Sequence, residues 1–146
     1  MTPPLTLYLE GIPPSVNHYW KTAGHRRYVS KAGVEFQERF GWMLKAACAP
    51  EPIPRFPGRV HVAVSLRPVT LKRRPDDIRP FDPDNTLKVL LDCLKLNRVI
   101  VDDSCKYIRR LTVTVEDATD TARTTVTVEE MADDTTRLLA AEEEGR

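Results

Sequence analysis

The strongest constraint on the fold is the strict alternation of apolar and other residues over residues 59–66, which read RVHVAVSL. Successive side chains of a strand point to opposite faces, so this segment predicts a strand with one buried face. Residues 31–49 and 85–96 carry apolar residues at helical spacing and can cover that face. We therefore expect an α+β fold, a single domain with a mixed β-sheet and two main helices.

Shorter patterns predict the remaining elements of this domain. Thr6–Glu10 predicts a first strand, Ser30 an N-cap for the first helix, and residues 99–101 a short apolar strand. Residues 108–115 and 123–128 alternate around an acidic turn and predict a hairpin. Between the first strand and Ser30, a polar and aromatic loop is expected. The domain should span residues 1–132, and the acidic segment 133–146 should be a frayed helix or disordered.

Composition argues against several classes of protein. No apolar run approaches the ~18 residues that a membrane-spanning helix needs, and the N-terminus lacks the basic and apolar regions of a signal peptide. A cytoplasmic location is therefore expected. The cysteines and histidines show no paired metal-binding spacing, so reduced thiols and no zinc site are expected. These residues are Cys48, Cys93, Cys105, His18, His25 and His61.

Charge is distributed unevenly along the chain. Residues 1–80 contain 13 Lys/Arg and 6 Asp/Glu, a net +7, whereas residues 81–146 contain 9 and 15, a net −6. A polyanion would meet the basic half, and an acidic cluster in the other half could hold cations. Alternatively, folding intermixes the two halves and leaves no directed field.

Two carboxylates around a proline form the most informative segment. Pro83 disfavours helical backbone at Asp82, and residues two apart in extended backbone point the same way. Asp82 and Asp84 are therefore predicted to converge. At about 4 Å two carboxylates repel by roughly 4 kcal/mol at an effective dielectric constant of about 20. A bound Mg²⁺ or Mn²⁺, which prefers oxygen ligands, would offset this repulsion.

Lys88 follows Asp84 by one helical turn. Hydrolysis of a phosphodiester needs a metal-polarised phosphate and a nearby cation, and this segment supplies the residues for both. The simpler alternative is that Asp84 is a helix N-cap, Asp82 a turn residue and Lys88 a surface partner of Asp92.

Asp102 and Asp103 form a second acidic pair after a short apolar run. Adjacent strand residues face opposite ways, so at most one of them should join a shared site. If the second helix returns the chain beside Asp82 and Asp84, a third carboxylate would complete an oxygen cage. The alternative is an ordinary strand-ending turn.

Taken together, these motifs resemble the RusA family of Holliday junction resolvases. The resemblance rests on FDPDNTLK at residues 81–88, on Leu91-Asp92 and Leu94, and on Val101-Asp102-Asp103. The segments PPSVNHYW at residues 13–20 and YVSKAG at 28–33 resemble the opening loop and helix start of the family.

The resemblance implies a structure-specific endonuclease that resolves four-way DNA junctions. By resemblance, Asp82, Asp84 and Asp103 would bind Mg²⁺, for which Mn²⁺ can substitute, and Lys88 would be the catalytic lysine. Asn85 and Asp102 would support the site. The family acts as a homodimer that nicks two strands symmetrically. The chain departs from the pattern in one place, because several residues separate its basic run, residues 72–74, from Asp82.

Basic side chains in two segments are candidate contacts to DNA phosphates. They are Lys21, Arg26, Arg27, Lys31, Lys72, Arg73 and Arg74. Tyr19 and Trp20 could stack on bases or, equally, be buried against the first helix, and Phe81 could wedge between base steps. Two other functions remain open: a junction-binding protein that does not cut, and a small metal-dependent nucleotide hydrolase.

Overall fold

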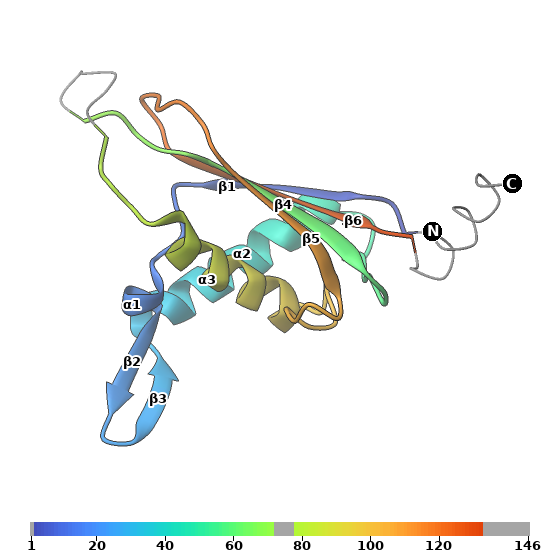
Figure 1. Ribbon diagram of the computed structural model, residues 1–146, viewed down its shortest axis with the longest axis horizontal. Coiled ribbons are helices and arrows are strands. Elements are labelled where there is room, and N and C mark those ends of the chain that lie inside the picture. Colours follow the sequence, from blue (N-terminus) through green and yellow to red (C-terminus); the bar gives the residue numbers. More distant parts are fainter. Residues whose placement is uncertain (1, 72–77, 133–146) are drawn as a thin grey trace, which may run out of the picture.

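The predicted central strand lies inside a four-stranded sheet. The computed structural model describes residues 2–71 and 78–132. Within them the strands β1 (Leu5–Glu10), β4 (Val60–Arg67), β5 (Ile108–Val115) and β6 (Arg123–Glu130) form a mixed sheet in the order β1-β6-β4-β5 (Figure 1). β4 pairs antiparallel with β6 and parallel with β5. The expected α+β class with a mixed sheet is confirmed.

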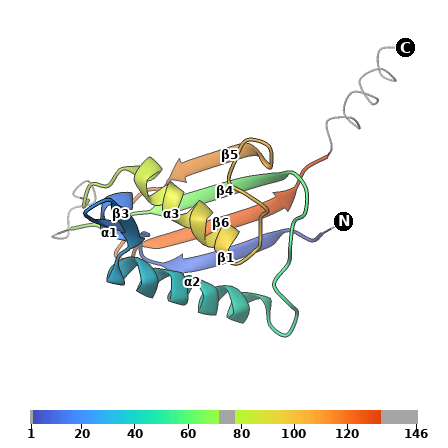
Figure 2. The same cartoon turned by 90° about the horizontal axis from the view of Figure 1, so that it is seen from below.

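Two helices, α2 (Lys31–Cys48) and α3 (Pro83–Leu96), cover the same face of this sheet (Figure 2). The apolar half of β4 is buried beneath them, and its valines and Leu66 are at most 2% exposed. Ser30 caps α2 as predicted, since its side chain accepts a hydrogen bond from the Gly33 amide. Among the described residues, no helix is long and apolar enough to cross a membrane.

The expected loop between β1 and Ser30 contains regular structure. A short helix, α1 (Val16–Tyr19), is followed by a hairpin of β2 (Trp20–Ala23) and β3 (Arg26–Val29). Gly24 takes the positive φ of 63° that a tight hairpin turn requires. The sequence of this hairpin shows no alternation of apolar and polar residues, because neither of its faces is deeply buried.

Two further predictions were wrong. Residues 108–115 and 123–128 are strands, but they do not form a hairpin, because β4 lies between them. Residues 99–101 do not form a strand, and Ile100 makes only an isolated bridge with Phe56. Residues 108–115 and 123–128 were correctly predicted to be strands. Which strand each one pairs with is determined by contacts with distant parts of the chain.

The β4–α3–β5 unit fixes where the ends of α3 lie. Parallel neighbours need a crossover connection, and here α3 provides it. α3 therefore begins at the end of the sheet where β4 and β5 terminate and finishes towards the end where they begin, as both views show. In open α/β sheets the carboxyl ends of the strands are the usual place for ligands.

Hydrogen bonds of the Tyr19 side chain join α1 to both main helices. Its ring is fully buried, and its hydroxyl donates to the Asp92 carboxylate at 2.7 Å and accepts from the Gln37 amide. Burial, together with the bond to Asp92, raises the pKa of the Tyr19 hydroxyl well above its usual range. Gly33 allows this close approach, because a Cβ there would lie 2.8 Å from the Tyr19 carbonyl oxygen.

Removing the Tyr19 hydroxyl should destabilise the fold. Tyr19→Phe leaves the Asp92 and Gln37 side chains without their shared partner, so we expect the free energy of unfolding to fall by about 1–3 kcal/mol. Tyr28→Phe is the control, because Tyr28 is 46% exposed, and it should change stability by less than about 0.5 kcal/mol. Urea unfolding measures both. Equal effects of the two substitutions would contradict this role of Tyr19.

Candidate functional site

Asp82 and Asp84 lie at the first turn of α3. Asp82 is the N-cap in extended backbone, with φ −94° and ψ 113°, and Pro83 occupies the first helical turn. Asp82 is extended, as predicted from Pro83, but the extended backbone predicted through Asp84 is wrong, because the helix begins at Pro83. The two carboxylates thus share a helix N-terminus, whose partial positive charge favours anionic groups.

The simpler alternative assigned the N-cap of the helix to the wrong carboxylate. Asp84 is not the N-cap, and the Asp82 side chain makes no capping hydrogen bond. Asp82 instead accepts a hydrogen bond from the Asn85 amide, with 3.3 Å between Nδ2 and Oδ2. Asp82, Asp84 and Lys88 are all exposed, so their charged groups are available to solvent ions and to a substrate.

The second acidic pair lies near the opposite end of α3. The Asp102 carboxylate is 3.0 Å from the Lys95 ammonium, and this contact holds the pKa of Asp102 below its usual value. Lys95 lies about 16 Å from Asp84 along the axis of α3. In the part of the chain that the structure describes, no three acidic, histidine or cysteine side chains lie close enough to hold a metal ion. One chain therefore does not bring Asp103 to Asp82 and Asp84.

Basic side chains lie at the same end of the molecule as the start of α3. The β2–β3 hairpin projects beyond the helices there (Figure 1) and carries Lys21, Arg26 and Arg27 in exposed positions, with Lys31 at the start of α2. The Arg27 guanidinium lies 4.6 Å from the centre of the Trp20 ring, a cation–π distance. Residues 72–74, the other predicted phosphate contacts, lie outside the described residues.

The aromatic residues that were predicted to contact bases differ in how far they are buried. Tyr19 is in the core and cannot stack on a base, so its burial alternative is correct. Trp20 is half-buried and packs edge-on against Tyr19. Phe81 is half-buried against the core and lines a cavity of about 310 Å³ together with Pro13 and Arg79. Phe81 therefore adjoins the acidic residues but is not a freely projecting wedge.

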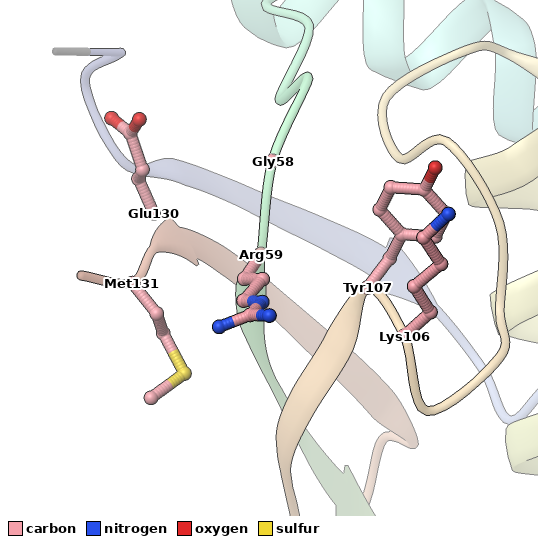
Figure 3. A pocket seen from close by; sticks show the side chains of 6 residues that line it. All are labelled: Gly58, Arg59, Lys106, Tyr107, Glu130 and Met131. Atoms are coloured by element: carbon pink, nitrogen blue, oxygen red, sulfur yellow. The ribbon is translucent and has the colours of Figure 1, made fainter. Parts of the chain in front are cut away.

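Another cavity, of about 350 Å³, lies at the opposite end of the sheet, where β4 and β5 begin. Figure 3 shows Arg59 between Glu130 and Met131 on one side and Lys106 and Tyr107 on the other. None of the predicted site residues lines this cavity. It therefore adds no group to the acidic site within one chain.

Cys93 is buried, and His61 makes two side-chain hydrogen bonds. All three thiols are free, as expected, and burial raises the pKa of Cys93 to about 12, which keeps it protonated. The His61 ring bonds to the Glu129 carboxylate at 2.8 Å and to the Thr112 hydroxyl at 2.9 Å. The exposed carboxylates at the start of α3 are therefore the groups best suited to chemistry.

Comparison with known proteins agrees with the motifs. No curated protein sequence matches the chain. The sequence model of the family described as Endodeoxyribonuclease RusA matches residues 10–129, which include every described element except β1, of which only Glu10 is matched, and the last residue of β6. The match covers both acidic pairs, Lys88 and the basic hairpin. The chain belongs to the RusA endodeoxyribonuclease family.

Proposed function

We propose that this chain resolves four-way DNA junctions by Mg²⁺-dependent hydrolysis of phosphodiester bonds, with paired nicks made by a homodimer. The observation that carries the proposal is the exposed group of Asp82, Asp84 and Lys88 at the start of α3, beside a projecting basic hairpin. Family membership supports a nuclease that acts on branched DNA. A twofold dimer also matches a twofold junction, because paired sites permit paired cuts.

The donor set at the start of α3 suits a hard cation. Mg²⁺ is commonly held by one or two carboxylates together with water and substrate phosphates, and Asp82 and Asp84 offer two exposed carboxylates. Asp103 is proposed as a third ligand, supplied by the other chain of the proposed homodimer. When bound, Mg²⁺ supplies neutralisation of the phosphate charge and a water of lowered pKa. Mn²⁺ has the same preference for oxygen ligands and is expected to substitute.

Other residues of the chain have proposed roles in orienting the site, stabilising charge and binding DNA. The Asn85 amide orients the Asp82 carboxylate through its hydrogen bond. The Lys88 ammonium, one turn beyond Asp84, stabilises negative charge on the phosphate or protonates the leaving oxygen. Lys21, Arg26 and Arg27 contact the DNA backbone at the same end of the molecule. The basic hairpin thus offsets the repulsion that DNA meets at the carboxylates.

Asp82→Asn should separate cutting from binding. The substitution removes one negative ligand and keeps the side-chain shape, so we expect junction nicking to fall by roughly 100-fold or more. Junction binding should be equal or tighter, because a charge that faces phosphate is lost. Glu38→Gln, an exposed position on α2, is the matched control and should change neither property. Retained nicking with weakened binding would refute the assignment of Asp82.

Lys88→Ala should slow nicking by about 10²–10³-fold, the usual cost of removing one preorganised donor. Affinity for Mn²⁺ alone, measured by calorimetry, should change little, since the carboxylates remain. Lys45→Ala on the exposed side of α2 controls for loss of a surface cation. An unchanged nicking rate in Lys88→Ala would show that Lys88 is a surface residue without a role in the reaction.

A further inference from the structure

A small apolar cavity borders the acidic residues at the start of α3. Its volume is about 310 Å³, which is at the lower end of the sizes of small-molecule sites. Phe81 lines this cavity and directly precedes Asp82, the N-cap of α3. Residues that follow β1 also line it, and the end of β1 and the start of α3 lie at the same end of the molecule (Figure 1). The cavity is therefore a neighbour of the candidate site.

The backbone holds two walls of the cavity beside each other. After β4, Thr70 and Ile78 form an isolated antiparallel bridge. In an antiparallel pair, the residues before one partner face the residues after the other, so residues 68–69 lie opposite residues 79–80. All four of these residues line the cavity. Its shape is thus set by backbone pairing and does not depend on a bound ligand.

The inner part of the cavity is apolar, and its rim is cationic. Pro13 and Pro68 are buried, and Phe81 is half-buried. Proline has no backbone N–H, and the Pro68 carbonyl already accepts a hydrogen bond from the Thr119 amide at 3.1 Å. Among the described residues that line the cavity, Arg79 is the charged one, and it is exposed. This lining suits a flat ligand with an apolar face and a polar edge.

We propose that this cavity binds one nucleobase of the junction, taken out of the stack beside the phosphate that is cut. The inference rests on the proposed function, which puts that phosphate at Asp82 and Asp84. The bases attached on either side of the phosphate are then the apolar groups of the DNA nearest to the cavity. Phe81 receives a base in its half-buried position and does not itself enter the DNA stack.

A nucleobase matches the lining on each side. Every base has a π-face that stacks on an aromatic side chain, and Phe81 supplies that ring. The Arg79 guanidinium at the rim can donate to acceptors on the edge of the base or to a flanking phosphate. Leaving the stack costs least for a base whose pairing is already weakened, as at the exchange point of a junction. The cavity therefore favours branched DNA over linear duplex.

Fluorescence of 2-aminopurine, which rises when the base leaves the stack, tests the proposal. Each junction carries this base at a different position bordering the exchange point. The Asp82→Asn chain is bound at saturation with Mg²⁺, so that the strands stay intact. The emission should rise at a position next to the exchange point, and a linear duplex with the same label should show no rise.

Filling the cavity should abolish this rise. In the same chain, Ala122→Trp adds bulk to the lining and keeps Phe81 and Arg79. It also keeps the bond from the Gly11 amide to the residue 122 carbonyl, which is 3.0 Å long. Junction affinity should fall by roughly 10-fold, since stacking of one base is lost. Ala46→Trp, at an exposed position of α2, is the matched control and should retain both the rise and the affinity.

A second variant is available if Ala122→Trp does not fold, as judged by circular dichroism. Phe81→Leu keeps an apolar contact with the core but removes the aromatic face, so it should also abolish the rise. An unchanged rise in the folded Ala122→Trp chain, or in Phe81→Leu when it takes its place, overturns the cavity as the site of the base.

The fluorescence also separates this inference from the proposed function. A bound junction that shows no rise at any position bordering the exchange point overturns the unstacked base, even if the wild-type chain nicks junctions. A wild-type chain that binds junctions and never nicks them would refute the proposed function. The fluorescence would still decide whether the cavity takes a base.

Discussion

The parallel pairing of β4 with β5 is the interaction on which the arrangement of the site depends. Parallel neighbours cannot be joined by a tight turn, so α3 has to cross the sheet between them. That crossover sets Asp82 and Asp84 at the carboxyl ends of the strands and Asp103 near the amino ends. It is stabilised by the buried side of α3, in which Val89, Leu90 and Leu94 are at most 1% exposed. The position of the carboxylates is therefore a property of the core.

Charge explains how an acidic site can serve a polyanionic substrate. Carboxylates at the start of α3 would repel DNA, but the helix N-terminus favours anions there and the basic hairpin lies at the same end of the molecule. In the proposed function, a divalent cation between carboxylate and phosphate would convert the remaining repulsion into attraction. Tyr19 contributes indirectly, because it joins the base of the hairpin to α3 through Asp92. The α1 end of the hairpin is thus joined by partly buried hydrogen bonds to α3, the helix that begins at the site.

Local patterns in the sequence predicted most of the elements, and distant contacts determined the rest. The alternation over β4 and the cap at Ser30 were correct, because each depends on neighbouring residues. The predicted hairpin of β5 and β6 failed, because a strand far earlier in the chain lies between them. The motif placed Asp82, Asp84 and Lys88 at the start of a helix, as the structure has them. The separation of Asp103 from them follows from the crossover, which no local spacing encodes. The β2–β3 hairpin buries too few side chains for its sequence to show an alternation of apolar and polar residues.

The most direct test of the central claim uses the wild-type chain and two DNA substrates. A labelled four-way junction and a linear duplex of matched sequence are incubated with the protein, with Mg²⁺ or with a chelator. The account predicts symmetric nicks in the junction alone, and only with Mg²⁺. Nicks that persist in chelator, or equal nicking of the linear duplex, would contradict it. Junction binding without nicks in either Mg²⁺ or Mn²⁺ would also contradict it and would indicate a protein that binds junctions without cutting them.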